Sequence, residues 1–485
     1  MFTDLPIYRQ PSFGMNGDMN TTPSPTQIVF GDALAGIGND IHSLISELYP
    51  ICRSITGDGL RQTLYTIQKM IPMVIREVAT GVQVFDWTVP REWNVSDAWV
   101  KNERGKKVID FQRSNLHLLN YSTPIHRTMP LSELRAHLYS LPNQPELVPY
   151  RTSYYKDNWG FCLSQRQLDA LPDGNYEVFI DTSLSIGSLS YGETYLPGEI
   201  EDEILISCHC CHPSLCNDNL SGVALAATLA RFLHNQPRRY SYRFLFIPGT
   251  IGSITWLAHN EEFVGRIKHG LVAACVGDAG YMHYKKSRRG NAEIDQVVQQ
   301  VLAQSGDQYE IHDFSPYGYD ERQYCSPGFN LPVGSLTRTP HGYFPEYHTS
   351  ADNLSFVKAE ALQNSFETYL AVCQRLDERS RLASQLGQRT NDQKKSTFDE
   401  LDMRHLRYVN TQPKCEPQLG RRGLFDAFGG YKDQKRSEMA MLWMLNYSDG
   451  EHTLGEIAAL SGFDIGLLHA IALTLLEHDL LTERI

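Results

Sequence analysis

The stretch EILISCHCCHPSLCNDNLSG, residues 203–222, decides the fold class of this chain. Its apolar start predicts a buried strand over 203–207, and its Asn/Ser-rich end predicts the capped start of a helix. His209 and His212 follow the strand, and Asp218 lies in the turn before the helix. Metal sites of α/β proteins lie where strands end, and imidazole with carboxylate suits Zn²⁺, so the stretch predicts a zinc site. The alternative is a capped helix beside two surface histidines.

Two later segments supply further ligand side chains. Asp278 follows an apolar strand predicted over 271–276, again at a strand tip. His348 lies in PEYHTSADNL, residues 345–354. An aspartate at a strand end is often only a cap, so neither segment alone predicts a metal ligand. Together with residues 203–222, both segments support the predicted zinc site.

The surrounding pattern is that of an α/β domain. Short apolar strands alternate with helical stretches, which is typical of a largely parallel, buried sheet. Strands are expected at 176–180, 203–207, 242–247 and 271–276, and helices at 222–233 and 294–304.

Changes in composition divide the chain into several parts. The first residues are rich in Pro, Ser, Thr, Asn and Gly, as in disordered tails. Short strands broken by Pro, Asn and Gly follow the first helices and indicate an inserted β-rich module. The expected parts are a disordered tail at 1–30, a metal-binding domain at 31–72 and 166–384, the β-rich module at 73–165, a polar linker region at 385–436, and three helices with a short ending at 437–485.

Bulk composition limits the classes of function. A chain of 485 residues is expected to form two or three domains. The net charge of −12 argues against a general nucleic-acid binder. No apolar run approaches the roughly 20 residues of a membrane span, and the first residues lack a signal-peptide pattern. We therefore expect a cytoplasmic protein, and its ten cysteines agree because they do not form a dense disulfide framework.

The motifs together resemble the zinc-dependent aminopeptidases. Their order is a strand-end His, an Asp-Asn-x-Ser-Gly aspartate, a Glu pair, a strand-end Asp and His-Thr-x-x-Asp. The chain is more closely similar to bacterial aminopeptidase-like proteins with an inserted β module and a C-terminal winged helix. The matching segments, spread over most of residues 35–485, are RSITG at 53–57, WGFCL at 159–163, DERQ at 320–323 and the His348 motif. The resemblance implies an α/β fold of zinc aminopeptidase type, with a mixed, mostly parallel sheet flanked by helices.

The resemblance also implies roles for individual residues. Asp218 would be the shared carboxylate ligand, and His348 and Asp278 would be further ligands. The first histidine is ambiguous. His209 ends the strand, whereas His212 belongs to the Cys-His-Pro element of the closer family and is nearer Asp218 in the turn, which slightly favours it.

One element of the family pattern is absent. The closer relatives carry a glutamate in Pro-Glu-Thr-Ile-Gly-Ser, but this chain has PGTIGS, with Gly249 in its place. A general base contributes about 10²–10⁴-fold to such a reaction, so its loss should impair amide hydrolysis. Glu321 and Glu346 are the nearest substitutes in the motif-bearing loops, and Glu321 is the candidate base.

Several side chains are candidates for substrate binding. Arg322 and Arg338 flank the loops leading to His348, and arginine binds carboxylates in bidentate fashion; an ordinary ion pair is the alternative. Arg53 matches a family motif and could approach the cleft. Tyr347, next to His348, is the fourth candidate for substrate binding.

The clustered cysteines raise a second possibility, a structural zinc site with Cys and His ligands. No second cysteine pair follows downstream, and alternate residues of a strand face opposite sides. We expect these cysteines to be packing residues instead: Cys208, Cys210, Cys211 and Cys216.

The C-terminal part has helix-turn-helix character at 454–476. Residues 437–485 contain one Lys or Arg, Arg484, and an excess of acidic residues. Phosphate contacts dominate nucleic-acid affinity, so this part is predicted to bind a protein partner or a second copy rather than DNA.

The leading prediction is a zinc-dependent amide or peptide hydrolase-like protein that acts on a small peptide or amide metabolite. The first alternative is a metal-supported, amide-forming acyl transfer in specialised metabolism, where loss of the base protects an intermediate from water. The second is a non-catalytic metal-binding scaffold.

Overall fold

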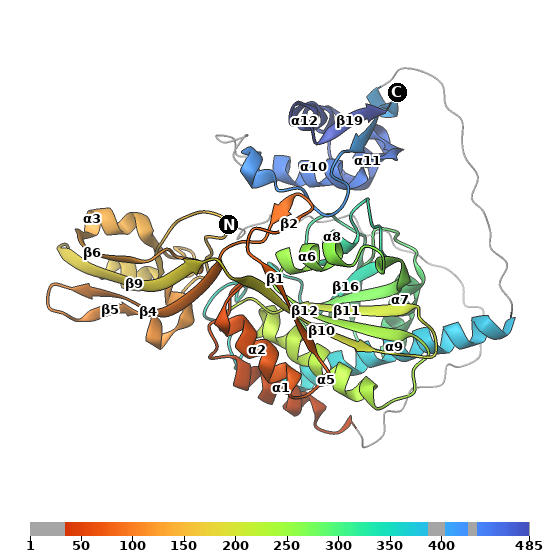
Figure 1. The fold of residues 1–485 in the computed structure, drawn as a ribbon, viewed down its shortest axis with the longest axis horizontal. Coiled ribbons are helices and arrows are strands. Elements are labelled where there is room, and N and C mark those ends of the chain that lie inside the picture. The colour runs from red at the N-terminus through yellow and green to blue at the C-terminus, as the bar shows by residue number, and fades with distance from the viewer. Residues whose placement is uncertain (1–33, 387–402, 425–433, 485) are drawn as a thin grey trace.

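The computed structural model describes residues 34–386, 403–424 and 434–484. The tail predicted at 1–30 lies outside the described residues, as does much of the region predicted as a linker. The remaining chain forms a large mixed sheet with helices on both faces, a second sheet to one side, and a small C-terminal domain (Figure 1).

The large sheet confirms the predicted fold class. Its centre is a run of parallel strands, and its two edges contain antiparallel pairs. Two central strands, Glu203–His209 and Val333–Thr337, are buried along their whole length, as expected in a parallel sheet covered on both faces. In spatial order, the strands are β1 (Val74–Ala79), β10 (Ser188–Leu196), β12 (Ser241–Ile247), β11 (Glu203–His209), β13 (Ile267–Ala273), β16 (Val333–Thr337), β14 (Met282–Lys285) and β15 (Tyr309–His312).

Helices cover the sheet on both faces. One face carries a continuous apolar core with α1, α2, α5, α7 and α9, and the other packs against α6, α8 and the second sheet. α5 is buried almost throughout because it lies between the sheet and two other helices. The bounds are α1 (Ile37–Leu48), α2 (Asp58–Gln68), α5 (Gly222–His234), α6 (Ile251–His259), η6 (Val264–Arg266), α7 (Glu293–Ser305), α8 (Glu321–Tyr324) and α9 (Ala359–Leu386).

The second sheet is an antiparallel module that extends away from the large sheet (Figure 1). Its order is β5 (Lys107–Asp110), β4 (Glu92–Asn102), β9 (Asn175–Ser185) and β6 (Ile125–Pro130). Around it lie η2 (Phe111–Arg113), η3 (Asn115–His117), α3 (Leu131–Leu134), η4 (Arg135–His137), β7 (Leu138–Tyr139), β8 (Phe161–Cys162) and α4 (Gln165–Asp169). A short hairpin of β2 (Gln83–Val84) and β3 (Trp87–Thr88) lies apart from it, next to α6 (Figure 1).

The module's strands do not follow the expected bounds of 73–165. β1 pairs with β10 in the large sheet, whereas β9, which contains the strand expected at 176–180 in the α/β domain, pairs with β4 and β6. Buried and exposed residues largely alternate along β9. This alternation is typical of an antiparallel sheet with one solvated face, not of a central parallel strand.

The C-terminal domain is a winged helix. A three-stranded sheet of β17 (Arg407–Asn410), β18 (Asp449–Thr453) and β19 (Leu481–Arg484) packs with α10 (Gln434–Tyr447), α11 (Leu454–Ser461) and α12 (Ile465–Glu477). The three helices match the sequence prediction. β17 does not, because it comes from the region expected to be a linker and supplies the central strand.

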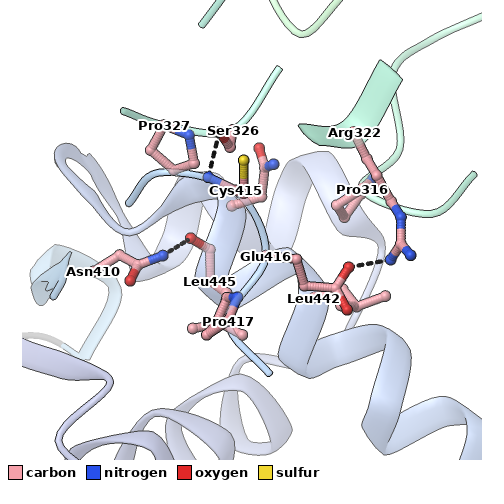
Figure 2. A pocket seen from close by; sticks show the side chains of 11 residues that line it. Pro316, Arg322, Ser326, Pro327, Asn410, Cys415, Glu416, Pro417, Leu442 and Leu445 are labelled. Carbon is pink, nitrogen blue, oxygen red and sulfur yellow. Dashed lines mark hydrogen bonds and ion pairs between the residues drawn. The ribbon is translucent and has the colours of Figure 1, made fainter. Parts of the chain in front are cut away.

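The described part of the region predicted as a linker packs against the rest of the molecule. It contains η7 (Met403–His405) and η8 (Leu419–Arg422). Arg421 and Arg422 both pair with Asp86, in the turn between β2 and β3. Arg322 pairs with Glu416 beside a small pocket between the large domain and the winged helix (Figure 2). Residues 403–424 are therefore packed structure rather than a free linker.

Among the described residues, no single helix is long and apolar enough to cross a bilayer. α11 and α12 reach the required length and composition only together, and the chain bends by 118° between them. The cytoplasmic location stays a prediction.

Candidate metal centre

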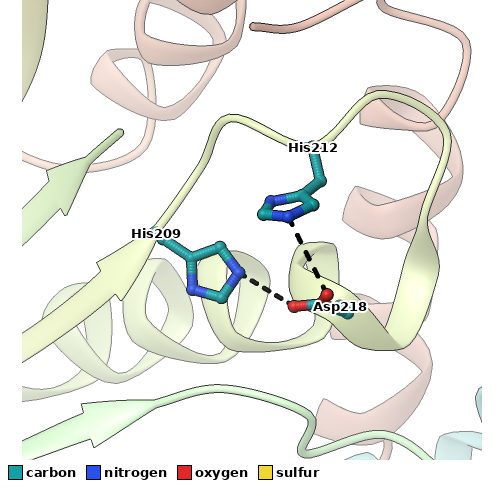
Figure 3. A group of neighbouring side chains, drawn as sticks. All are labelled: His209, His212 and Asp218. Atoms are coloured by element: carbon teal, nitrogen blue, oxygen red, sulfur yellow. Dashed lines mark hydrogen bonds and ion pairs between the residues drawn. The ribbon is translucent and has the colours of Figure 1, made fainter. Parts of the chain in front are cut away.

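The centre of the site is the turn between β11 and α5. β11 ends at His209, the following loop carries His212, and η5 (Cys216–Ser221) carries Asp218. The backbone leaves helical geometry at Asp218, with φ −112° and ψ 84°. The carboxylate consequently points back toward the two histidines (Figure 3).

Asp218 is shared by three imidazoles. His209 Nε2 lies 2.9 Å from Oδ1. On the other oxygen, Oδ2, His348 Nε2 lies at 2.9 Å and His212 Nε2 at 3.9 Å. The ligand atoms of His209, His212 and Asp218 lie within 4.8 Å of one another. The structure thus brings both candidate histidines and His348 around one carboxylate.

The geometry at Oδ2 fits a metal ion. Asp218 Oδ2 and His348 Nε2 are both buried and have no hydrogen-bond partner in the described structure, although they lie 2.9 Å apart. Their orientation fails the requirements of a hydrogen bond, and an unsatisfied buried polar atom costs about 1–3 kcal/mol. Two ligand atoms that face a common point would be satisfied by one cation, and the donor set of imidazole and carboxylate suits Zn²⁺.

The protonation states also suit a cation. Burial raises the pKa of the Asp218 carboxyl, but His212, His209 and His348 outweigh this and hold it well below its usual range. Burial lowers the pKa of His212 well below its usual value. A carboxylate and a neutral imidazole are the forms that bind metal.

Asp352, in the His348 motif, holds the turn in place. Its Oδ1 accepts backbone N–H groups of Cys216 at 3.1 Å and Asn217 at 2.6 Å, and its Oδ2 accepts that of Asp218 at 2.9 Å. The last aspartate of the motif therefore fixes the backbone that presents the shared carboxylate.

The structure does not bring Asp278 into the cluster. Its carboxylate accepts hydrogen bonds from Asn217 Nδ2 at 3.0 Å, Thr339 Oγ1 at 2.6 Å and the Gly280 N–H at 2.7 Å. The strand expected to reach residue 276 ends at Ala273 in β13. Where β13 ends, the side-chain amide of Asn219 donates to the Ala273 carbonyl and accepts from the Cys275 N–H. These two hydrogen bonds replace those that a neighbouring strand would make.

Cys275 lies close enough to Asp218 for its thiol to feel the charge of the carboxylate, and it was not predicted. It has φ 52°, and burial raises the pKa of its thiol well above the usual value, with the charge of Asp218 adding to this. A cysteine in an apolar strand gives no sequence signal of such a position.

Aromatic side chains enclose the histidines. Tyr319 donates a hydrogen bond to Asp218 Oδ1 at 2.8 Å and lies 2.9 Å from the hydroxyl of Tyr347. The Tyr347 ring stacks on His348 at 4.0 Å. This places Tyr347 beside the cluster, as its prediction as a substrate-binding residue requires. Tyr319 was not predicted, although it directly precedes the DERQ segment.

Tyr150 reaches the cluster from the loop between β7 and β8. Its ring contacts His212 at 5.1 Å and His348 at 5.2 Å, and its N–H donates to the His348 carbonyl at 2.7 Å. Only the tertiary structure could show this contact, because the segment carries no recognised motif.

The position of the missing glutamate faces another carboxyl group. A Cβ at Gly249 would lie 3.0 Å from His209 Cβ and 3.7 Å from Asp320 Oδ2. Asp320 is fully buried, its Oδ1 accepts from Ser253 Oγ at 2.7 Å, and its Oδ2 has no hydrogen-bond partner in the described structure. Burial raises the pKa of Asp320 to about 6, with His209 opposing the shift.

The two glutamates considered as substitutes have other environments. Glu321 is buried and forms an ion pair with Lys285, with Oε1 2.5 Å from Nζ. Glu346 accepts hydrogen bonds from Thr349 through its backbone carbonyl. No observation tests Glu321 as a base, and its role stays a prediction.

The three predicted arginines do not meet at the cluster. Arg53 is buried behind it and donates to the carbonyls of His212 at 3.0 Å and Leu48 at 2.5 Å. Arg322 pairs with Glu416 at the winged-helix interface (Figure 2). Arg338 donates to Asn364 on α9 at 2.9 Å. Arg322 thus has an ion pair, the alternative to substrate binding, whereas Arg53 and Arg338 donate to backbone carbonyl and amide oxygens.

The clustered cysteines lie on different faces of the sheet. Cys208, Cys210 and Cys216 belong to one apolar core and Cys211 to the other. Burial raises the pKa of each of these thiols. They are packing residues, as the sequence indicated.

A mostly parallel sheet flanked by helices, with a His/Asp cluster at the end of a central strand, defines an aminopeptidase-like protein. The chain belongs to the family described as "Domain of unknown function (DUF4910)", which matches residues 42–379. Residues 406–483 match a winged helix-turn-helix family.

Individual relatives agree with this assignment. The chain is 50% identical, over 92% of its length and 96% of the relative's, to a Clostridium acetobutylicum protein that carries the name of a polysaccharide biosynthesis protein with an aminopeptidase-like domain. A crystal structure of a C. acetobutylicum protein named as a peptidase matches with a TM-score of 0.70 and 48% identity, covering 93% of this chain and 97% of the other. The zinc aminopeptidase BSAP from Bacillus subtilis matches with a TM-score of 0.53 and 12% identity over 70% of this chain and 95% of the other, a likeness of fold alone.

Proposed function

We propose that this protein is a zinc-dependent amide hydrolase that acts on a small amide or peptide-like substrate. The observation that carries the proposal is the unsatisfied pair of Asp218 Oδ2 and His348 Nε2, flanked by His212 and His209. These four residues would hold the ion. Zinc bound there would act as a Lewis acid on the substrate carbonyl.

The phenols at the cluster act as hydrogen-bond donors. Burial, followed by the charge of Asp218, raises the pKa of Tyr319 well above its usual value. The hydroxyl therefore stays protonated at neutral pH. It orients Asp218 through Oδ1 and leaves Oδ2 facing His348.

Proton handling in the proposed reaction falls to Asp320. Hydrolysis breaks the amide C–N bond, takes a proton from water and delivers one to the leaving amine. Asp320 Oδ2 is the unpartnered carboxylate oxygen beside position 249. It is better placed for this than Glu321, whose charge is already neutralised by Lys285.

The test compares the wild type with two variants at position 249. In the wild type Asp320 takes the place of the absent glutamate. Gly249→Glu restores that carboxylate and should raise hydrolysis above the rate that Asp320 supports, by at most the about 10²–10⁴-fold that a general base usually contributes. Gly249→Gln, of equal size and without charge, should give no such gain. Both side chains would press on His209, since their Cβ would lie 3.0 Å from its Cβ. Equal rates for Gly249→Glu and Gly249→Gln on every amide that the protein binds would refute the hydrolytic proposal.

The relative's name, which places that protein in polysaccharide biosynthesis, supports a proposal for the substrate class. We propose an amide carried by a carbohydrate precursor, such as an N-acylated amino sugar. Release of free amine would be measured with an N-acetylated amino sugar and with an aminoacyl anilide. Faster release from the anilide would favour a peptide-like substrate instead.

Gly249 specifically favours a second candidate, acyl transfer to an amine. Without a glutamate at this position, water activation is weaker and an amine can compete for the acyl group. Supplying an amine acceptor separates the reactions, because hydrolysis yields a free acid and transfer yields a new amide. A protein that binds zinc but gives neither product would be a metal-binding scaffold.

The winged helix is proposed to contact protein, either a partner or a second copy of the chain. In its described residues α11, α12 and β19 contribute one arginine, Arg484, which donates to the Gly450 carbonyl at 2.5 Å. Leu460 and Leu473 are exposed. Fluorescence anisotropy with duplex DNA at low salt should show no binding, whereas salt-sensitive binding would contradict the proposal.

A further inference from the structure

A second group of ligand side chains lies at the far edge of the large sheet. β14 and β15 pair in parallel there, with His283 opposite Glu310 and Lys285 opposite His312. Successive side chains of a strand alternate between faces. Glu310 and His312, two residues apart on β15, therefore share the face that His283 occupies on β14.

The three side chains converge closely. Their ligand atoms lie within 4.8 Å of one another. His283 Nδ1 lies 2.9 Å from His312 Nε2 and 3.7 Å from Glu310 Oε2. Tyr281 stacks on the His283 ring at 4.5 Å and restricts its rotation. A single hydrogen bond between the rings would explain why two histidines lie together. The Glu310 carboxylate beside them adds a third side chain that can bind a metal ion.

The chemistry of this set is that of a transition-metal site. Burial lowers the pKa of His283 to about 4, with His312 adding to the effect. Burial also lowers the pKa of His312. Both imidazoles are therefore neutral at pH 7 and offer lone pairs. Nitrogen ligands suit Zn²⁺ and similar ions, whereas Mg²⁺ and Ca²⁺ prefer oxygen.

We infer that His283, Glu310 and His312 bind a second zinc or similar divalent transition-metal ion, separate from the ion at Asp218. The side chain of Glu310 is 50% exposed and that of His312 36%. The ion can therefore enter from solvent, and water completes its coordination.

The location suggests what this ion does. β15 is an edge strand whose one strand partner in the described sheet is β14, and an ion shared by the two would fasten it. The segment that leaves β15 after His312 runs to Tyr319, which donates to Asp218. A metal at His312 anchors the start of the segment that presents Tyr319 to the first cluster.

The test uses the full chain stripped of metal and then dialysed against Zn²⁺. The Asp218→Asn variant removes the shared ligand of the first cluster, so zinc retained by it reports the second site alone. Adding His283→Ala and His312→Ala to this variant should abolish that zinc. Adding His126→Ala should not, because His126 is an exposed histidine with a single carboxylate partner, Glu177.

Glu310→Gln provides a variant with little risk to folding, since the position is exposed. In the Asp218→Asn background it should weaken zinc binding by at least about 10-fold, the lower end of what a lost supporting group costs a metal site. Folding is checked by near-ultraviolet circular dichroism. The inference is overturned if folded Asp218→Asn protein holds no zinc, or if it holds the same amount after His283 and His312 are replaced. Neither result bears on the hydrolase proposal, which rests on Asp218.

Discussion

At the scale of single residues, Asp218 organises the first cluster. Each of its oxygens faces a different partner set: Oδ1 faces His209 and Tyr319, and Oδ2 faces His348 and His212. Asp352 fixes the backbone below it. A carboxylate whose two oxygens face different partners can bind one metal ion through Oδ2 or bridge two metal ions.

Replacing Asp218 tests this role directly. Asp218→Asn should abolish zinc binding at the first cluster, because the ligand common to all three histidines loses its charge. The matched control is Asp278→Asn, which should keep the metal because Asp278 is occupied by Asn217 and Thr339. Isothermal titration of metal-free protein with Zn²⁺ measures both. Loss of the metal in Asp278→Asn, with the fold intact, would restore Asp278 as a ligand.

At the scale of elements, the β-rich module contributes directly to the site. Its loop pairs with the His348 motif through Val148 and Ser350, whose backbone groups bond at 2.9 Å, and it places Tyr150 against two histidines. The insertion thus shapes one wall of the metal centre.

Shortening Tyr150 should show how much the metal centre depends on this loop. Tyr150→Ala removes a buried ring and should destabilise the protein by about 3–5 kcal/mol. It should also weaken zinc binding by about 10–100-fold, as the loss of supporting groups does. Tyr150→Phe loses only the hydroxyl contact with Tyr154 and should retain near-normal zinc affinity. Thermal unfolding and zinc titration measure the two effects. If Tyr150→Ala binds zinc normally, the loop is not part of the metal centre.

At the scale of the whole molecule, the winged helix is docked onto the large domain. Arg288 donates to Asp449 at 2.6 Å and to Asn446 at 2.9 Å, and its side chain is largely buried. Phe314 packs in the core of the winged helix. Together with the Asp86 pairs, these contacts connect the domains at two places.

Breaking the Arg288 contact should loosen the docked domain. Arg288→Ala removes the guanidinium from the half-buried Asp449 carboxylate, which keeps its contacts with His452, so the cost should be below the about 3–5 kcal/mol lost when a fully buried pair is broken. Hydrogen exchange should accelerate in 434–484. The control, Arg289→Ala, removes an exposed neighbour and should leave exchange unchanged. Unaltered exchange in Arg288→Ala would show that the docking depends on other contacts.

Asp449 makes the same interface sensitive to acid. Burial raises its pKa, but His452 and Arg288 outweigh this and hold the Asp449 carboxyl below its usual value. A carboxyl with a lowered folded-state pKa contributes stability above its unfolded pKa of about 3.9, and this stability is lost as the pH falls through the folded value. The free energy of unfolding should therefore fall more steeply below about pH 4 in the wild type than in Asp449→Asn. Equal slopes would contradict the role of this carboxylate.

Much of the fold could be predicted from local patterns. The alternation of strands and helices indicated a mostly parallel sheet, and residues 203–222 indicated a histidine and aspartate site at a strand end. The fold prediction is confirmed, because burial on both faces leaves a direct mark in the sequence. The structure groups His209, His212 and Asp218 at the predicted strand end, and the metal stays a prediction. The module bounds failed at β9 because strand partners, not strand character, decide the sheet.

The sequence by itself determined the class of fold, the winged helix, the stretch that bears the candidate metal ligands and the glycine in place of a glutamate. Only the tertiary structure decided that three histidines share Asp218, that Asp278 lies apart, and that Asp320 and Tyr150 approach from distant segments. The physical reason is that metal and proton chemistry depend on separations of a few ångströms between side chains. Such separations arise from packing between segments far apart in the chain, and no local pattern encodes them.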